Sequence, residues 1–179
     1  IKAEASELVK YLKQQQIELM IMSGDFIPVV KSIAEKIGIA PEFAFGELSP
    51  EAKASEIRKL SYAGFIGDGV NDALAMKTAY LGIGLQGGIE SNFEVADVYL
   101  LNGDLQNVVD LFAAAKRTLR LVKRNILLAA CYNTLAAPLA ACGYINPIFA
   151  AFVMPLASLT VISSTLLSKP FNCAVARGK

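Results

Sequence analysis

Histidine and tryptophan are absent from this sequence of 179 residues, and cysteine occurs only at Cys131, Cys142 and Cys173. Without histidine, the commonest transition-metal ligand is missing. The cysteine count is odd and includes no Cys-x-x-Cys pair. A disulfide framework is therefore not expected, and the composition is consistent with a reducing, cytosolic environment. Any transition-metal site in these residues must use other ligands.

Charged side chains are missing from residues 125–168, whereas residues 1–124 hold 14 Lys and Arg and 16 Asp and Glu. An uncharged stretch of 44 residues is too long for one buried helix and fits two membrane crossings of about 20 residues each with a turn. The alternative is a pair of core helices, which would normally show a polar face. Glycine and proline at 143–147 indicate the turn, so we predict transmembrane helices over 125–142 and 148–167.

Basic residues flank both outer ends of the uncharged stretch, and the connecting turn has none. Lys169 follows the stretch, and five basic residues precede it: Lys116, Arg117, Arg120, Lys123 and Arg124. Both ends are therefore expected to be cytoplasmic, including the tail 169–179, in a multi-pass integral membrane protein that contacts the lipid bilayer. The net charge of +1 and the lack of a basic aromatic patch argue against nucleic acid as a partner.

Residues 1–103 alternate between apolar strand patterns and amphipathic helix patterns. Strands are expected over 17–22, 43–45, 62–66, 80–85 and 95–101, and helices over 4–15, 27–37, 51–60 and 71–79. This alternation predicts an α/β fold with a parallel sheet covered by helices on both faces. Residues 104–124 are predicted to connect it to the membrane, with one long helix over 105–122.

The most informative segment is the run Gly67-Asp68-Gly69-Val70-Asn71-Asp72. It follows the predicted strand 62–66, and loops at the carboxyl ends of parallel strands are where ligands bind in α/β sheets. Glycines allow the backbone to approach a ligand closely. Carboxylates beside a helix amino terminus suit a hydrated Mg²⁺ bound next to a phosphate. The alternative is an ordinary Asn/Asp/Gly turn without chemistry.

Three motifs together resemble those of P-type ATPases. The run from Gly67 resembles the hinge motif GDGxNDxxAL, with Met76 in place of its last Leu. Ser23-Gly24-Asp25 resembles the T-G-D loop, with a hydroxyl residue retained, and the segment from Pro50 to Lys53 resembles P-x-x-K. The resemblance implies a Rossmann-like sheet of haloacid-dehalogenase type, which this chain would contain in part, followed by the transmembrane hairpin.

The same resemblance implies a phosphoryl-transfer site that uses Mg²⁺ and ATP. Asp68 would be the Mg²⁺ ligand, with Asp72 and Asn71 supporting the metal and the phosphoryl oxygens. Lys53, the Ser23 hydroxyl and the Gly24 amide, in the loop that ends at Asp25, would neutralise the transferring phosphoryl group. Such transfer depends on positioning and charge compensation, and these residue types provide both.

The nucleophile motif of that family, Asp-Lys-Thr-Gly-Thr, does not occur in this sequence, which starts at Ile1. We therefore expect the chain to be the C-terminal part of a longer pump and to be inactive toward ATP by itself. Its partners would then be the rest of the same pump, namely the actuator and nucleotide domains and the earlier membrane helices.

The predicted membrane helices carry a few polar and soft side chains: Tyr132, Asn133, Met154 and Ser158. A thioether beside a phenol, an amide and a hydroxyl suits Cu(I), whereas neither carboxylate nor imidazole is present for Zn²⁺ or Ca²⁺. The alternative is that these groups only join helices and fill space. Copper-transporting P-type ATPases are similar, with Tyr-Asn in one helix and Met-x-x-Ser-Ser in the next. This sequence differs by having Ala157 and Pro155 in the second motif.

The resemblance therefore implies a heavy-metal pump that exports Cu(I), with a copper chaperone among its partners. One alternative is a separate membrane-anchored module that regulates or binds phosphate through a relic site. Another is a small membrane-tethered phosphatase, which would need a nucleophilic aspartate after its first strand. The early aspartate at a strand end is Asp25, and it occupies the T-G-D position instead.

Overall fold

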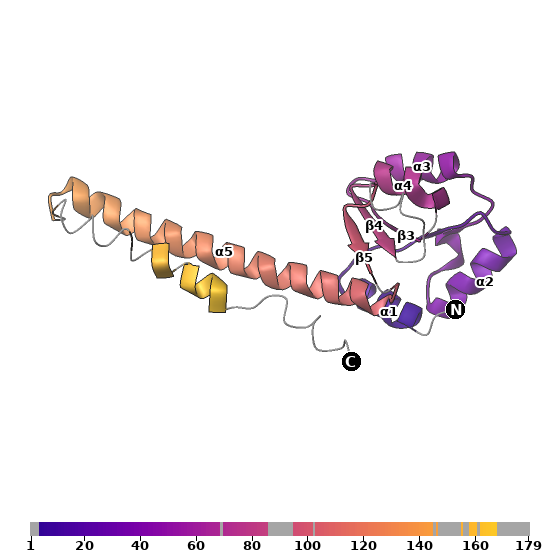
Figure 1. Cartoon of the computed structure of the whole chain (residues 1–179), viewed down its shortest axis with the longest axis horizontal. Coiled ribbons are helices and arrows are strands. Elements are labelled where there is room, and N and C mark those ends of the chain that lie inside the picture. The colour runs from indigo at the N-terminus through magenta and orange to yellow at the C-terminus, as the bar shows by residue number, and fades with distance from the viewer. Residues whose placement is uncertain are drawn as a thin grey trace. The chain divides into compact units, whose positions relative to one another are not determined.

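Short parallel strands alternate with helices through the amino-terminal part of the chain (Figure 1). The computed structural model describes residues 4–68, 70–85, 95–101, 103–144, 146, 155, 158–160 and 162–167. The helices are α1 Glu4–Gln14, α2 Ile27–Ile37, α3 Pro50–Arg58, α4 Ala73–Thr78 and α5 Gln106–Ala141, with 3-10 turns η1 Pro41–Phe43 and η2 Val70–Asp72. The strands are β1 Ile21–Met22, β2 Ala44–Phe45, β3 Gly64–Gly67, β4 Leu81–Leu85 and β5 Val98–Leu100. The chain divides into two units, Ile1–Val109 and Asp110–Lys179.

All described strand pairs are parallel, as the alternation predicts, but they form two ladders. Strand β1 pairs with β2, placing Ile21 opposite Ala44. Strand β4 lies between β3 and β5, with Gly67 opposite Gly84. Among the described residues no ladder joins these two groups, so the expected single sheet is present as two parallel sheets.

Two apolar clusters hold the helices against these strands. One consists of buried residues of α1, α2, β2 and the loop after α2: Val9, Val30, Ala34, Ile39 and Ala44. Helix α4 packs on β3, β4 and α3, and its Met76 is almost fully buried, as is Ile83 of β4. These contacts fix the loops that follow β1 and β3, where the sequence predicts the site.

The apolar run 17–22 forms a shorter strand than its pattern predicts, because β1 covers only Ile21–Met22. The Ile17 amide donates to the Leu12 carbonyl at 3.2 Å, and Gln16 has a φ of 60°. Residues 15–17 therefore complete the end of α1. The prediction of a strand was wrong at its start, because helix termination uses the first residues of the run.

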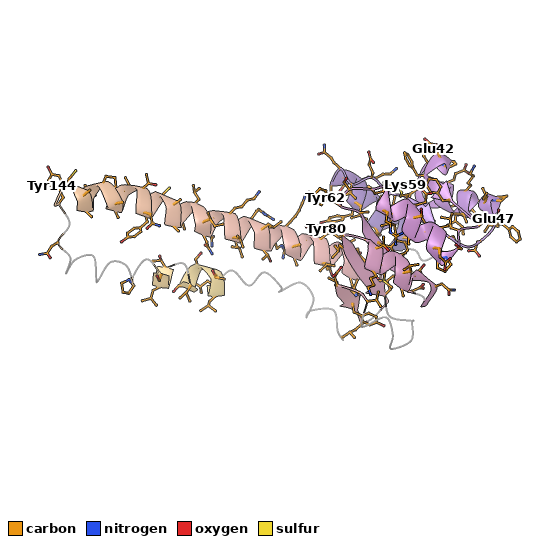
Figure 2. The ribbon with its side chains drawn as sticks, turned by 90° about the horizontal axis from the view of Figure 1, so that it is seen from above. Glu42, Glu47, Lys59, Tyr62, Tyr80 and Tyr144 are labelled. Carbon is orange, nitrogen blue, oxygen red and sulfur yellow. The ribbon has the colours of Figure 1, made fainter. Side chains whose placement is uncertain are left out.

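Tyr62 and Tyr80 lie at the opposite ends of β3 and β4 from the predicted site. They precede the two strands, and their rings meet edge to face with centroids 5.1 Å apart (Figure 2). Aromatic rings prefer such edge-to-face pairs. This pair therefore joins the amino-terminal ends of the two strands and leaves their carboxyl ends for the polar loops.

Helix α5 continues from the predicted connecting segment into the uncharged stretch without interruption. It ends in a glycine cap: Gly143 has a φ of 76°, its amide donates to the Ala140 carbonyl at 3.0 Å, and the Tyr144 amide donates to Leu139 at 2.9 Å. Glycine adopts this left-handed conformation without a Cβ penalty. Within the described ranges, no helix combines the length and the apolar character needed to cross a bilayer.

Candidate functional site

The loop after β1 is folded around the Ser23 hydroxyl. This hydroxyl donates to Asp25 Oδ2 at 2.9 Å and accepts from the Asp25 amide at 3.2 Å. The Ser23 amide donates to the Phe45 carbonyl at 2.9 Å, which extends the contact between β1 and β2. Ser23 is half-buried, whereas Gly24 and Asp25 are exposed. The loop is thus fixed at its base and open at its tip.

The segment after β2 supports this loop from the side. The Glu47 amide donates to the Asp25 carbonyl at 2.7 Å, and the Leu48 amide donates to the Ser23 carbonyl at 3.0 Å. A Cβ on Gly46 would lie 2.7 Å from the Asp25 carbonyl oxygen, so only glycine fits there. Sequence reasoning missed Gly46. A glycine directly after a predicted strand was the signal that could have indicated a close backbone approach.

Helix α3 begins directly after this supporting segment. Ser49 is its N-cap, and its hydroxyl accepts from the Ala52 amide at 3.2 Å. Such capping satisfies one of the free amides of the first turn. The pKa of the exposed Glu51 carboxyl is lowered by a hydrogen bond to its own backbone amide and then by one to the Ser49 side chain. The cap fixes the turn from which Lys53 extends.

Lys53 is a buried cation, with 8% of its surface exposed. Its Nζ donates to Asp72 Oδ1 at 2.8 Å. A buried charge is costly unless it is paired, so the contact with Asp72 stabilises Lys53 in this position. The pair joins α3 to the residue that immediately precedes α4. It gathers a cation and a carboxylate at the carboxyl end of β3.

Gly67, the last residue of β3, is buried against the same carboxylate. A Cβ there would lie 2.8 Å from Asp72 Cβ, 2.9 Å from Asp72 Oδ2 and 3.0 Å from a ring carbon of Phe65. Real Cβ atoms essentially never show contacts as short as the two with Asp72. The first glycine of the motif is therefore required by packing, because it makes room for the aspartate that holds Lys53.

Replacing Gly67 with alanine should destabilise the first unit by about 1–3 kcal/mol, the usual cost of overpacking. The added methyl group must displace Asp72 and weaken its contact with Lys53. The measurement is the urea dependence of unfolding, followed by circular dichroism. Gly64→Ala in the same strand is the matched control, because its Cβ would meet the Leu81 carbonyl oxygen at an ordinary contact distance of 3.8 Å. Equal stability of the two variants would contradict this packing role for Gly67.

Asp68 follows β3 and is exposed, as is Asn71 in η2; Gly69 lies outside the described residues. Groups of three or more His, Cys, Asp or Glu side chains able to hold a metal do not occur in the described ranges. Mg²⁺ is usually bound by one or two carboxylates together with water and phosphate oxygens. The hard oxygens of Asp68 and Asp72 fit this ion.

The structure thus brings several of the predicted site residues into contact. Lys53 and Asp72 are paired, and the loop of Ser23 is hydrogen-bonded to the residues just before α3. The expected convergence of Asp68 with Ser23 and Lys53 within one pocket stays a prediction. A buried cation and oriented donors of this kind can compensate the charge of a transferring phosphoryl group.

Residues 1–79 match a hydrolase family model, haloacid dehalogenase-like hydrolase. The chain is 34% identical over 170 residues to the probable copper-importing P-type ATPase A of Enterococcus hirae, a match that covers 93% of this chain and 23% of that protein. It is 35% identical over 170 residues to the copper-exporting P-type ATPase of Bacillus subtilis, covering 93% and 21%. A solved structure of a zinc-transporting PIB-type ATPase matches with a TM-score of 0.81 at 26% identity, covering 94% of this chain and 28% of that one.

The chain is a homologue of heavy-metal P-type ATPases. The predicted family resemblance and the haloacid-dehalogenase-like α/β fold with parallel sheets are confirmed. The chain spans less than a quarter of the length of these two curated relatives. The homology extends through most of α5 and beyond the region that the hydrolase model matches, because the match covers 93% of the chain.

In this P-type ATPase homologue, the predicted cargo residues lie in the second unit. Tyr132 is half-buried in α5, its neighbour Asn133 is exposed, and Ser158 is exposed. Met154 lies outside the described residues. The half-buried positions of α5 in this region recur at helical spacing: Leu121, Asn125, Tyr132 and Ala136. Tyr132 therefore belongs to a single stripe of the helix, and Asn133 lies beside that stripe.

Proposed function

We propose that this chain is the part of an ATP-driven heavy-metal pump that carries its magnesium and phosphoryl-site residues and part of its metal pathway. The observation that supports this most is the ion pair between the buried Lys53 and the half-buried Asp72. Asp72 lies four residues after the exposed Asp68, and the chain is homologous to P-type ATPases. A paired cation at a strand end, next to a loop with an exposed carboxylate, is suited to phosphoryl transfer.

The proposed roles follow the donor types. The Ser23 hydroxyl, the Gly24 amide and the Lys53 ammonium neutralise the phosphoryl group, and Asp25 holds the Ser23 hydroxyl through the observed hydrogen bond. Asp68, with Asn71 and Asp72, provides oxygen ligands for Mg²⁺, which when bound would supply further charge neutralisation. Removal of the phosphoryl group after transfer requires the same charge compensation.

The phosphorylated aspartate and the ATP site are proposed to come from the rest of the pump, its nucleotide and actuator domains. The chain by itself is therefore not expected to hydrolyse ATP. The test is acid-stable ³²P incorporation from ATP into the full-length protein, together with its loss when the aspartate of an upstream Asp-Lys-Thr-Gly-Thr motif is replaced. A reading frame without that motif would favour the alternative, a separate membrane-anchored phosphate-binding module.

We further propose that residues 125–168 form a transmembrane hairpin. Two hydrogen bonds support it: Asn125 Nδ2 donates to Thr165 Oγ1 at 3.0 Å, and Arg124 donates to the Ser164 hydroxyl. Residues 40 positions apart thus meet, and the midpoint between positions 124 and 164 falls at Tyr144. Figure 2 labels Tyr144 at the end of α5. This midpoint lies in the predicted turn 143–147, and the large apolar side chains of α5 are exposed as lipid contact would require.

Tyr144 should be accessible from the far side of the membrane if both ends of the hairpin are cytoplasmic. The measurement is labelling of Tyr144→Cys by a membrane-impermeant maleimide in intact cells, using a protein in which Cys131, Cys142 and Cys173 are serine. We expect labelling without permeabilisation.

Lys36→Cys, on the exposed surface of α2, provides the control. It should react only after the membrane is opened, because the first unit is proposed to be cytoplasmic. Labelling of Tyr144→Cys from the cytoplasmic side alone would overturn the hairpin topology.

The transported ion is proposed to be Cu(I), bound by Tyr132, Asn133, Met154 and Ser158, exported from the cytoplasm and delivered by a copper chaperone. The two hydrogen bonds support this proposal. If the helices continue antiparallel with the same register, Ser158 would lie about level with Tyr132, since each helix rises by about 1.5 Å per residue. Met154 provides the soft donor that selects Cu(I). The test is whether Cu(I) or Zn²⁺ stimulates ATP hydrolysis by the full-length protein.

A further inference from the structure

The basic residues of α5 lie on one face of the helix. They occupy five positions within nine residues: Lys116, Arg117, Arg120, Lys123 and Arg124. At about 100° per residue, these positions fall within an arc of about 120°. All five side chains are exposed. We call this set the basic face.

The other sides of the same helical segment have a different character. The half-buried stripe that includes Leu121 and Asn125 faces the contact with Thr165. A third side is apolar and exposed, with Leu119 at 58%, Val122 at 45% and Ile126 at 64%. The basic residues are thus segregated from both the hairpin contact and the apolar side. Charges that only set membrane orientation need no such segregation, because orientation depends on their number near the helix end.

Acidic residues of the same unit do not balance the charge of the basic face. Asp110 is the last acidic residue of the sequence, and every charged side chain after it is positive. Most of the complementary negative charge must therefore come from outside the unit. The uncharged residues 125–168 begin directly after Arg124, so the surface nearest to the basic face in the proposed topology is the cytoplasmic leaflet.

We propose that the basic face binds the phosphate groups of anionic phospholipids in the cytoplasmic leaflet. This rests on the transmembrane hairpin of the proposed function. Lys and Arg side chains can extend along a helix while keeping their charged ends at the headgroups, and each one near an anionic surface contributes about 1 kcal/mol, which corresponds to about fivefold in affinity.

The experiment is electron paramagnetic resonance of spin-labelled phosphatidylglycerol and phosphatidylcholine in phosphatidylcholine vesicles that contain the full chain. The ratio of the two association constants measures headgroup preference and requires neither ATP nor a metal. We expect a ratio clearly above one that falls severalfold in the double variant Arg120→Gln/Lys123→Gln. It should also fall with added salt, because salt screens exposed charges.

Lys31→Gln/Lys36→Gln is the matched control, because it removes two exposed charges from α2 and should keep the preference. An unchanged ratio in the α5 variant, or an equal loss in the control, would overturn the basic face as the binding site. Stronger competition by inorganic phosphate than by chloride at equal ionic strength would also overturn it, in favour of a free-phosphate site. Absence of any motionally restricted lipid would instead refute the hairpin itself.

Discussion

Replacing Asp68 with alanine in the full-length protein should reduce metal-stimulated ATP hydrolysis by roughly a thousandfold, as expected when a charge-stabilising group is removed from a phosphoryl-transfer site. Asp68 is exposed at the carboxyl end of β3, four residues before the Asp72 that pairs with the buried Lys53. Its carboxylate is the oxygen ligand that we assign to Mg²⁺. The measurement combines phosphate release with acid-stable ³²P incorporation.

Glu42→Ala is the control for this variant. Glu42 lies in η1 and is exposed (Figure 2), so its loss removes the same charge from another exposed position of the first unit. It should leave turnover unchanged. Normal phosphoenzyme turnover in Asp68→Ala would refute the proposed magnesium site, provided that circular dichroism shows an intact fold.

Replacing Met154 with leucine should abolish most Cu(I)-stimulated ATP hydrolysis while the protein still folds and inserts. Leucine retains the shape and hydrophobicity of methionine at a packing cost below about 1.5 kcal/mol, so the change isolates the thioether. We expect the Cu(I) concentration for half-maximal stimulation to rise at least about tenfold, the lower end of the loss typical when a metal's ligand sphere is perturbed. The measurement is a Cu(I) titration of ATP hydrolysis.

Met20→Leu controls for the loss of a thioether elsewhere, because Met20 lies just before β1 in the first unit. It should retain the Cu(I) response. Unchanged stimulation in Met154→Leu would exclude Met154 as a ligand. Stimulation of the unmodified protein by Zn²⁺ without any response to Cu(I) would overturn the copper assignment as a whole.

Much of the first unit could be predicted because local sequence signals agree with the fold. The helix predicted over 51–60 is present as α3 Pro50–Arg58, with Ser49 as its cap, since serine accepts from free amides and proline fits the first turn. The motif from Gly67 lies directly at the end of β3, as its preceding apolar run indicated. In both cases the information lies within a few consecutive residues.

The parts that could not be predicted depend on distant contacts. Nothing near Lys53 in the sequence indicates that its partner is Asp72, which was assigned to the metal. The separation of the β1–β2 sheet from the β3–β4–β5 sheet likewise depends on which strands pair. The hydrophobic periodicity of a strand does not specify its partner strand, so this separation could not be predicted. The use of Ile17 to end α1 shows the limit of patterns even locally, because an apolar residue can pack equally well in a strand or beside a helix end.

Helix α5 is continuous from the fully buried Val108 to Ala141, and this has a consequence for protein engineering. Each added residue would turn everything downstream by about 100°. A chimaera that joined this first unit to the membrane helices of a relative would have to conserve the number of residues between Val108 and Asn125. A single insertion there would turn Asn125, together with the rest of the chain after it, by about 100° relative to Val108 while leaving every local helix preference satisfied. The number of residues between Val108 and Asn125 therefore constrains such a graft more than sequence identity does.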